Sequence, residues 1–372
     1  SYTQKAIATL ADKKTLHIGF VSGDLRNHPV GYFIEGMLKH LNPNKLQLFA
    51  YSTNAQTDEL SERIKPFFNK WLDLPIDFAE AAAIITQDSI DILIDLAGYT
   101  HKSGTAIFAW HPAPIQISWL GYFASTGLNC FDYFLADPIS VPTQEQNHFS
   151  EKVYYLPHTR LCFTAPEYNI AISELPAIKN KFITFGCFQH TRKITAETQK
   201  AWGQILLACP NSRLLIKNNQ IDDISLQDTL LEYFYNLGIT VNRIVFEAGG
   251  SREQYLAAYN RVDFILDTFP FPGGTTTCEA LWMGVPTLTL SGNTLLQRQG
   301  HSMMANANLQ EWICFSTEEY INKAIAFSNN IDHLSQLRKN LRQQALNSPL
   351  MNTPLFAQHF EQAMFDIWHH HT

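Results

Sequence analysis

The sequence contains no run of eighteen apolar residues and no surplus of basic side chains. A transmembrane helix needs about 20 consecutive apolar residues, so we expect no membrane span. Lys and Arg number 27 against 34 Asp and Glu, which gives a formal net charge of −7. Nucleic-acid binders usually carry a basic excess, so we expect no nucleic-acid partner, although a local basic pocket for a small phosphate is compatible with this balance.

Paired cysteines are also missing. None of the six cysteines forms a Cys-x-x-Cys motif or stands near a histidine at zinc-site spacing. We therefore expect buried free thiols in a reducing compartment, which predicts a cytoplasmic protein. The chain begins with serine and without a signal peptide, which predicts a processed, tagged or excised piece of a longer protein. The terminal His369, His370 and His371 are interpreted as a tag remnant or natural tail rather than a metal site.

What the sequence does contain is a regular alternation of strand-like and helix-like segments. A length of 372 residues suggests about two domains. In the first half, short apolar runs bounded by turn residues predict strands, and amphipathic stretches predict helices. The predicted strands are 16–22, 47–52, 90–96, 115–120, 133–136 and an edge strand 152–156, with helices near 31–40 and 78–86.

The alternation stops between residues 161 and 181, where Pro166, Pro176 and scattered polar residues indicate a connection between domains. It then starts again. The predicted strands of the second half are 182–188, 213–216, 243–246, 262–266 and 287–290, with a helix over 196–208 and a helical tail over 333–368 that is interrupted near Pro349 and Pro354.

Alternation of this kind predicts parallel sheets with helices on both faces. We expect two Rossmann-like, doubly wound α/β domains facing a cleft. Residues 1–165 form the first, 166–181 the connection, 182–348 the second, and a C-terminal helix over 349–372 packs back on the first. Ligands of such sheets bind beyond the carboxyl ends of the strands. No repeat of 20 to 50 residues is visible.

The segment that follows the predicted strand 262–266 is the most informative. After Asp267 comes a loop with two prolines and two glycines, and a short helix is predicted from Thr275 to Gly284. The N–H groups at such a helix start, with threonine hydroxyls beside them, favour a phosphate. Glu279 lies one turn further in and could hold ribose hydroxyls. The alternative is a structural helix in which Glu279 is a partner of the helix dipole.

Other polar residues follow further predicted strands. Arg192 or Lys193, after strand 182–188, could neutralise a diphosphate, or both are ordinary surface charges. His28 precedes a proline on the loop after strand 16–22 and could act as a base or position an acceptor, while a structural or exposed histidine is the alternative. His101, after strand 90–96, is a second candidate of this kind.

Seven strings occur in an order that resembles the catalytic region of the O-GlcNAc transferase and SPINDLY family of glycosyltransferases. They are HPVGYF, DLAGYTHKSG, HPAPIQISWLGYFASTG, DYFLADP, FGCFQHTRKIT, NSRLLIK and DTFPFPGGTTTCEALWMGVPTLTLSGNT. The resemblance covers the chain from Leu16 to Trp368. It implies a GT-B fold, in which two Rossmann-like domains hold a nucleotide-sugar in the cleft.

The resemblance also implies roles for individual residues. His28 matches the active-site histidine on the acceptor side, where Tyr99 and His101 are further candidates. Lys193 matches the lysine that contacts the donor diphosphate, and we take it with His28 as catalytic. Thr275 and Thr276 match phosphate-binding threonines, Glu279 the ribose acid, and Arg252 with Tyr255 the frame of the base. The implied donor-binding set is His190, Lys193, Arg252, Tyr255, Gly273, Gly274, Thr275, Thr276, Thr277 and Glu279.

Departures from the family bear on the donor. The O-GlcNAc branch usually carries a histidine where this chain has Gly274, and an aspartate and a histidine where residues 81–86 offer neither. The loop DTFPFPGGTTTCEAL instead resembles the SPINDLY protein O-fucosyltransferase branch. UDP-GlcNAc is our first choice of donor and GDP-fucose the alternative. Members usually carry tetratricopeptide repeats before this region, so we expect that such a region is missing from the chain.

The predicted reaction transfers a sugar to serine or threonine hydroxyls of a protein or peptide. No Asp-x-Asp pair lies between predicted strands, so we expect no metal or other cofactor. A helix N-terminus and Lys193 would then meet the charge of the leaving group. Two other readings stay open: a GT-B enzyme acting on a lipid or polysaccharide, and a catalytically degenerate module that binds a nucleotide or peptide.

Overall fold

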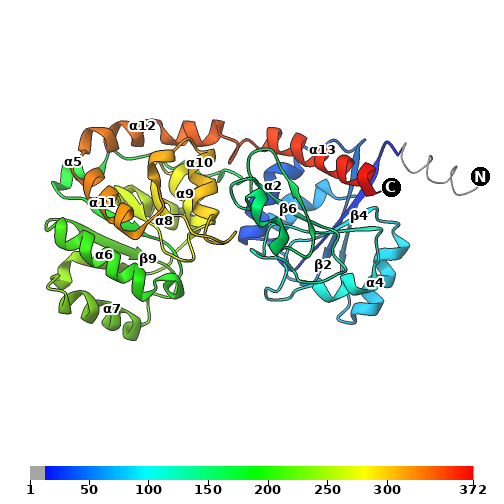
Figure 1. The fold of residues 1–372 in the computed structure, drawn as a ribbon, viewed down its shortest axis with the longest axis horizontal. Helices are drawn as coiled ribbons and strands as arrows, with labels where there is room; N and C mark the ends of the chain where they lie inside the picture. The colour runs from blue at the N-terminus through cyan, green and yellow to red at the C-terminus, as the bar shows by residue number, and fades with distance from the viewer. Residues whose placement is uncertain (1–12, 372) are drawn as a thin grey trace, which may run out of the picture. The chain divides into compact units, whose positions relative to one another are not determined.

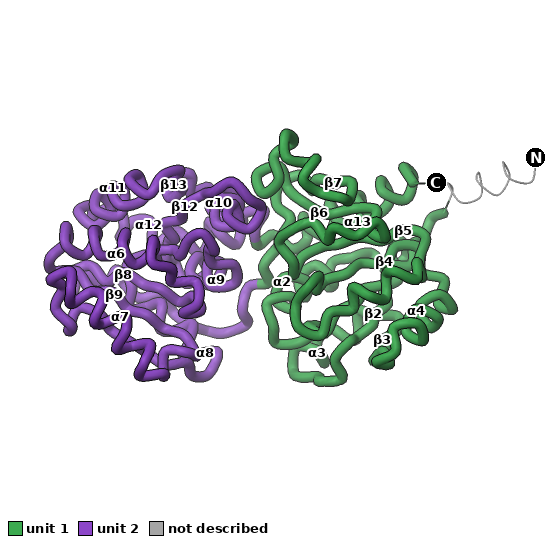
Figure 2. Tube along the Cα trace, turned by 60° about the horizontal axis from the view of Figure 1, so that its bottom comes forward, with its two compact units in different colours: residues 1–164, 351–372 green, residues 165–350 purple. Residues whose placement is uncertain are grey.

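Strands and helices alternate along the chain in the computed structural model, which describes residues 13–371 (Figure 1). The chain divides into two compact units, coloured separately in Figure 2. Unit 1 contains the residues up to Thr164 together with those from Met351 onward, and unit 2 contains Ala165–Leu350. Unit 2 is thus a continuous stretch of chain, whereas unit 1 is made of two stretches.

Unit 1 is built on a parallel sheet of seven strands in the order β3-β2-β1-β4-β5-β6-β7. Its strands are β1 Leu16–Ser22, β2 Leu46–Ser52, β3 Lys70–Asp73, β4 Ile92–Asp95, β5 Ile115–Ser118, β6 Tyr133–Ala136 and β7 Lys152–Tyr155. Its α-helices are α2 Pro29–Leu38, α3 Glu59–Ile64, α4 Phe78–Gln87 and α13 Thr353–His371.

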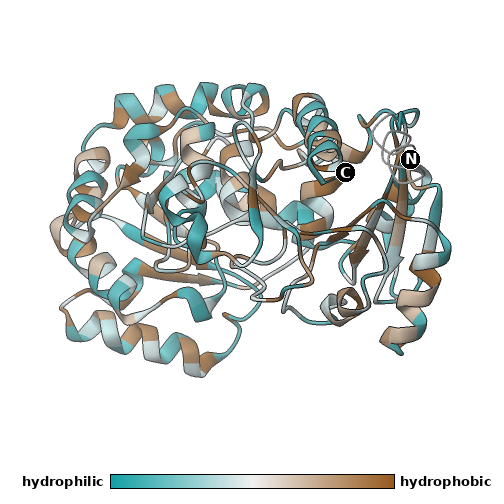
Figure 3. Cartoon of the chain, turned by 45° about the vertical axis from the view of Figure 1, so that its right-hand side comes forward, coloured by the Kyte–Doolittle hydropathy of each residue, from teal (hydrophilic) through white to brown (hydrophobic). Residues whose placement is uncertain are grey.

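Both faces of this sheet are covered by helices. Successive residues of a strand point to opposite sides of the sheet, so neighbours in β1 pack against different helices. On one side Val21 of β1 joins a buried cluster with Ala81 and Ile85 of α4. On the other side its neighbour Phe20 stacks on Phe360 of α13, with ring centroids 6.2 Å apart. Figure 3 shows the hydrophobic residues gathered along the strands, as this double burial requires.

Unit 2 is built on a parallel sheet of six strands in the order β10-β9-β8-β11-β12-β13. Its strands are β8 Thr184–Cys187, β9 Arg213–Lys217, β10 Ile244–Glu247, β11 Phe264–Leu266, β12 Thr287–Leu290 and β13 Ile313–Cys314. Its α-helices are α5 Pro176–Asn180, α6 Ala196–Ala208, α7 Ile224–Asn236, α8 Arg252–Ala257, α9 Thr275–Trp282, α10 Gln299–Asn306, α11 Thr317–Ser328 and α12 Ile331–Asn347.

The structure corrects several predicted boundaries. Helix α2 begins at Pro29 rather than near residue 31, because proline fits a first helical turn and His28 caps it. Helix α9 ends at Trp282, and Gly284 follows with the positive φ of +73° that glycine tolerates. Helix α5 lies inside the predicted connection. The tail breaks between α12 and α13, and Pro354 belongs to the first turn of α13 instead of interrupting a helix.

Each sheet has one point where the chain order reverses, between β1 and β4 in unit 1 and between β8 and β11 in unit 2. Loops leave the carboxyl ends of the two strands in opposite directions at such a point, which opens a crevice for ligands. His28, Tyr99 and His101 lie on the loops after β1 and β4. Lys193 and Gly273 lie on the loops after β8 and β11. Sequence candidates in both units therefore fall beside the reversal.

None of the six cysteines forms a disulfide, as expected, although Cys130 and Cys209 are only half-buried. None of the helices between residues 13 and 371 has the length and apolar character that crossing a bilayer requires.

Candidate functional site

The loop between β11 and α9 is anchored by a buried carboxylate. Asp267 directly follows β11, and its Oδ1 accepts hydrogen bonds from the backbone N of Gly273 at 2.8 Å and of Thr268 at 3.0 Å. Its Oδ2 accepts from the Thr289 hydroxyl at 2.8 Å. Burial raises the pKa of Asp267 to about 6, against the lowering effects of these bonds and of the Lys193 charge. The loop is therefore folded back onto the end of its own strand.

Polar side chains converge on Gly273. A Cβ on this residue would lie 2.5 Å from Oγ1 of Thr277, 2.7 Å from Oγ1 of Thr276 and 2.9 Å from Nε2 of Gln189. The Thr277 hydroxyl is buried and has no hydrogen-bond partner among residues 13–371. No described side chain caps α9, whose first residue is Thr275. The loop thus carries an unused hydroxyl next to the uncapped N–H groups of a helix start, which suits an anion.

Lys193 reaches the same loop from the other side of the chain reversal. It belongs to a short 3₁₀ helix, Thr191–Lys193, after β8, and its Nζ donates to the carbonyl of Pro272 at 3.0 Å. The ammonium also lies 3.6 Å from the centroid of the Phe271 ring. Burial lowers the pKa of Lys193 to about 8, partly offset by the negative charge of Asp267. The side chain is therefore a positive charge held beside Gly273 near neutral pH.

Glu279 is paired rather than free. It is 1% exposed, and its Oε1 lies 2.5 Å from Nη1 of Arg252, the first residue of α8. Burial raises the pKa of Glu279, while Arg252 and a hydrogen bond from Tyr259 lower it. The side chain is more than a surface partner of the helix dipole, because it is buried against a charge from another helix. A carboxylate has about four acceptor sites, so the ion pair leaves room for ribose hydroxyls.

The remaining donor-side candidates lie around these groups. Tyr255 donates from its hydroxyl to the carbonyl of Phe188 at 2.9 Å and meets the Phe188 ring edge to face. His190 is exposed, and its Nδ1 caps the 3₁₀ helix by accepting from the backbone N of Arg192 at 3.1 Å. Its pKa is lowered by burial and by the charges of Arg192 and Lys193.

In unit 1, His28 caps α2. Its Nδ1 accepts from the backbone N of Val30 at 3.3 Å and lies 3.6 Å from Oδ2 of Asp24. Burial lowers the pKa of His28, against the raising effect of Asp24, and Arg26 lowers it further. The neutral imidazole that results carries its proton on Nε2 whenever Nδ1 accepts from Val30. In that state Nε2 donates a hydrogen bond and does not act as a base.

The other two candidates of unit 1 differ in how they are held. Tyr99 is 52% exposed, and its hydroxyl donates to the carbonyl of Thr126 at 2.5 Å. His101 is exposed on a turn of the same loop. This loop is tied to the carboxyl end of β4 by Asp95, whose buried carboxylate accepts from the backbone N of Ala97 and Gly98. The loop base is thus fixed while Tyr99 and His101 face solvent.

Three residues of this region were not selected from the sequence. Gln189 donates from Nε2 to Oδ1 of Asp267 at 2.9 Å, and Gln299 donates from Nε2 to the carbonyl of Gly273 at 2.9 Å. Asp267 itself was read as the end of a strand. For Gln189 and Asp267 the signal that could have pointed to them is position, since they come within two residues after the two strands beside the chain reversal.

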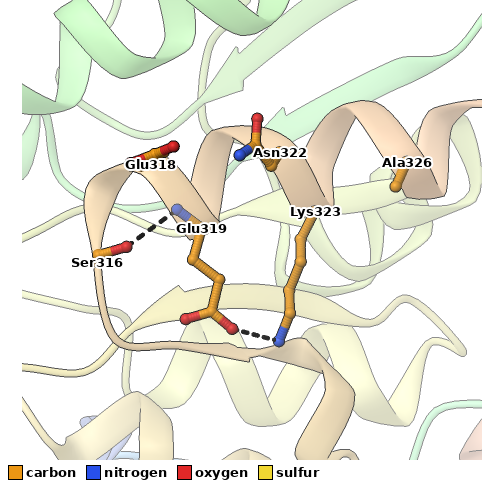
Figure 4. A pocket seen from close by; sticks show the side chains of 6 residues that line it. All are labelled: Ser316, Glu318, Glu319, Asn322, Lys323 and Ala326. Atoms are coloured by element: carbon orange, nitrogen blue, oxygen red, sulfur yellow. Dashed lines mark hydrogen bonds and ion pairs between the residues drawn. The ribbon is translucent and has the colours of Figure 1, made fainter.

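Two hollows on the surface of unit 2 involve none of the sequence candidates. One, of about 450 Å³, is lined by residues of α11 and by Ser316 before it, and its Glu319 and Lys323 pair with each other at 2.9 Å (Figure 4). The other, of about 580 Å³, is lined by residues around the start of β8 and the ends of α6 and α11. Neither combines an unpartnered buried hydroxyl with a helix start, so the loop before α9 remains the candidate site.

Comparison with known proteins identifies the relatives. The model of glycosyl transferase family 41 matches residues 1–170 and 170–360. A Hordeum vulgare protein named probable UDP-N-acetylglucosamine–peptide N-acetylglucosaminyltransferase SPINDLY is 34% identical over 375 residues, covering 99% of this chain and 40% of that protein. An Arabidopsis thaliana protein named probable UDP-N-acetylglucosamine–peptide N-acetylglucosaminyltransferase SEC is 32% identical, and the match covers 96% of this chain and 38% of that protein. The chain thus spans about two fifths of these relatives.

Solved structures agree with this assignment. A mutant of the Thermobaculum terrenum O-GlcNAc transferase is 32% identical with a TM-score of 0.91, covering 96% of this chain and 68% of that one. Anabaena HepE in complex with UDP is 11% identical with a TM-score of 0.63, covering 94% of this chain and 100% of that one, and supports the fold alone. The predicted fold class, two Rossmann-like domains of the GT-B type, is confirmed. The chain belongs to glycosyl transferase family 41.

Proposed function

We propose that the chain transfers a sugar from a nucleoside diphosphate to a serine or threonine hydroxyl of a protein or peptide. The observation that carries this proposal is the buried, unpartnered Thr277 hydroxyl beside Gly273, at the carboxyl end of β11 and within reach of the loop that Lys193 holds. Such an arrangement suits a diphosphate, which accepts hydrogen bonds and carries negative charge.

On the donor side, each group has a distinct task. The first-turn N–H groups of α9, the hydroxyls of Thr275–Thr277 and the Lys193 ammonium bind the diphosphate. Glu279 accepts hydrogen bonds from the ribose, and Arg252 holds Glu279 in place. Tyr255 frames the base, and His190 lies at the rim.

The chemical difficulty of the reaction lies in the departure of the diphosphate. Negative charge grows on its oxygens as the bond to the sugar carbon breaks. Donors that are already oriented stabilise this charge without reorganising, which is the largest contribution in many enzymes. Lys193 and the start of α9 provide such donors, since the ammonium and the loop are both held by hydrogen bonds. This set acts without a metal ion.

On the acceptor side, we propose that His28 positions the hydroxyl by donating a hydrogen bond from Nε2. The contact between its Nδ1 and the backbone N of Val30 supports this role over that of a base. Tyr99 and His101 are exposed side chains on the neighbouring loop and suit contacts to a peptide.

The names of the relatives favour UDP-GlcNAc as donor. A specific observation favours the alternative, GDP-fucose. Gly274 stands where the O-GlcNAc branch carries a histidine, and a Cβ there would lie 2.9 Å from Nε2 of Gln299. The space at this position is therefore already occupied. Loss of that histidine, together with the SPINDLY-like loop, is why we keep GDP-fucose as the second candidate.

A ligand panel tests the proposal. The protein is heated with UDP, GDP, UDP-GlcNAc, UDP-glucose or GDP-fucose, and the shift in melting temperature is recorded. A ligand at a hundredfold excess over its Kd stabilises the fold by about 2.7 kcal/mol. Mass spectrometry of a peptide mixture with the stabilising donor then detects transfer. Transfer to peptides supports the proposal. If the donor binds but is neither transferred nor hydrolysed, the chain is a degenerate binding module. Transfer to a lipid or polysaccharide but to no peptide contradicts the protein acceptor.

A further inference from the structure

We infer that Asp267 and Gln299 are positioning residues that hold the backbone of Gly273 at its N–H and at its carbonyl, and so preorganise the diphosphate loop, residues 268–274. This inference rests on the proposed function. The Gly273 N–H donates to Oδ1 of Asp267 at 2.8 Å, and the Gly273 carbonyl accepts from Nε2 of Gln299 at 2.9 Å. Both side chains are buried, so water does not compete for either bond.

Asp267 is suited to positioning because its carboxylate is buried and bound by four donors of the protein. Four donors bind it: Nε2 of Gln189, the backbone N of Thr268 and of Gly273, and the hydroxyl of Thr289. Three of these donors bind Oδ1, the Thr289 hydroxyl binds Oδ2, and the side chain is 0% exposed, so the carboxylate is enclosed by protein groups. Its backbone carbonyl is also held, by the hydroxyl of Tyr320 at 2.9 Å. Asp267 therefore acts through the loop and does not touch the substrate.

Gln299 holds the carbonyl side of Gly273 and links two helix starts. It is the first residue of α10, and its amide lies against Gly274, the residue before α9. A Cβ on Gly274 would come within 2.9 Å of the amide nitrogen, so glycine at this position is what admits Gln299. The oxygen of the same amide is buried without a partner among residues 13–371. Gln299 thus makes one oriented bond, and that bond is to the loop.

The consequence concerns phosphate-bearing ligands in particular. Two consecutive glycines have wide backbone freedom, and ordering them on binding would weaken the affinity for the ligand. Held at both ends, Gly273 keeps the hydroxyls of Thr276 and Thr277 converged before a ligand arrives. A nucleoside without phosphates does not contact this loop. Loss of either bond should therefore weaken diphosphate binding and leave nucleoside binding unchanged.

The test compares Gln299→Ala and Asp267→Ala, each of which removes the bond to Gly273, with the unchanged protein and with Gln297→Ala. Gln297 is a matched control, since it is the same residue type two positions away and accepts from the backbone N of Asn293 instead of reaching Gly273. Each protein is titrated with UDP and uridine, and with GDP and guanosine, by NMR and calorimetry. We expect diphosphate affinity to fall about five- to tenfold in both variants, as for the loss of one hydrogen bond. Nucleoside affinity should change less than twofold, and Gln297→Ala should match the unchanged protein.

Two results would overturn the inference: equal losses for diphosphate and nucleoside, which indicate a general structural defect, or unchanged diphosphate affinity in Gln299→Ala. If Asp267→Ala does not fold, Gln299→Ala decides alone, because it leaves the Asp267 bonds in place. Failure of the proposed function looks different. In that case the unchanged protein binds neither UDP nor GDP, whereas failure of the inference leaves its binding intact and removes the difference between variants.

Discussion

At the scale of single residues, the charge of Lys193 gives the most direct test of donor binding. Its ammonium is held 3.0 Å from the Pro272 carbonyl, beside the candidate diphosphate site. A charge-assisted hydrogen bond contributes roughly 1.5–3 kcal/mol, and 1.4 kcal/mol is a factor of about ten. Lys193→Ala should therefore lower nucleoside diphosphate affinity and turnover at least tenfold, measured by calorimetry and a donor assay. Near-normal turnover in a folded variant would contradict this role.

The same residue predicts a dependence on pH. Because burial lowers the pKa of Lys193 to about 8, the ammonium is charged below that pH and loses its proton as the pH rises through it. Diphosphate affinity should fall between pH 7 and 9. The Lys193→Arg variant should bind the diphosphate more weakly at pH 7, because arginine differs in shape from lysine. Since arginine keeps its charge throughout this range, the affinity of the variant should stay nearly constant from pH 7 to 9. Parallel pH curves for the two proteins would show that another group titrates.

Glu279 makes a prediction about the ribose. Glu279→Gln removes the negative charge and weakens the ion pair with Arg252, so a loss of melting temperature is expected whatever the ligand role. The informative measurement is discrimination between a nucleoside diphosphate and its 2′- and 3′-deoxy forms. A ribose ligand makes the unchanged protein prefer the full ribose about tenfold or more, and Glu279→Gln should lose most of that preference. Equal discrimination in both proteins would remove Glu279 from the ribose site.

Residues were predictable where they formed a local pattern. Thr276, Thr277 and Glu279 belong to one short helix, so their closeness follows from their spacing along the chain. Their exact partners do not: Glu279 meets Arg252 from another helix, and Gln189 meets Asp267 across 78 positions. Gln299 is 26 positions from Gly273. Such pairs depend on how strands are ordered in the sheet, which no local pattern contains.

At the scale of elements, the two sheets use the same device at the chain reversal. Asp91 and Asp95 bracket β4, and Asp263 and Asp267 bracket β11, both as Asp, three apolar residues and Asp. The first aspartate accepts from the strand beside it, Asp91 from His17 N and Asp263 from Thr184 N, each at 2.7 Å. The second holds the loop that leaves the strand. One motif thus fixes a central strand at both ends in each unit.

This device predicts a stability effect. Asp263 accepts from the backbone N of Thr184 and of Ala177, at 2.7 and 2.8 Å. Asp263→Ala would leave two buried N–H groups unpaired, and each costs about 1–3 kcal/mol. Unfolding in urea should show a loss of about 2 kcal/mol or more, whereas Asp228→Ala on the exposed side of α7 should change stability by less than about 0.5 kcal/mol. Equal effects would contradict a special role for the motif.

Most strands were predicted to within one or two residues because each contains a run of apolar residues, which is buried in the central strands and partly exposed in the edge strands β7 and β10. The two that were missed lack that signal. Strand β3 is the half-exposed edge sequence KWLD, and β13 has two residues. Both lie at the edge of a sheet, where one side of the strand has no neighbour to bury against and no apolar run is required.

At the scale of the whole molecule, we predict that sugar transfer does not depend on a metal ion to stabilise the charge of the leaving group. Across residues 13–371 no three His, Cys, Asp or Glu side chains are grouped in a way that could hold a metal ion. Under the proposed function, Lys193 and the start of α9 stabilise the charge of the leaving group instead. EDTA should leave sugar transfer within about twofold of the untreated rate. Complete loss with EDTA and recovery on adding manganese or magnesium would reveal a metal site.

Helix α13 has a consequence for how the chain is made. Its Phe356 and Phe360 pack on Trp119 beside the sheet of unit 1, and its Asp366 accepts from the Tyr154 hydroxyl at 2.8 Å. A ribosome therefore releases every residue of unit 2 before it releases the helix that completes unit 1. Domains generally fold as units during synthesis, the first to emerge leading. In this chain the order is reversed. Unit 2 can complete its folding while unit 1 still exposes Phe20 and Trp119, because the nineteen-residue helix α13 that covers them is synthesised later.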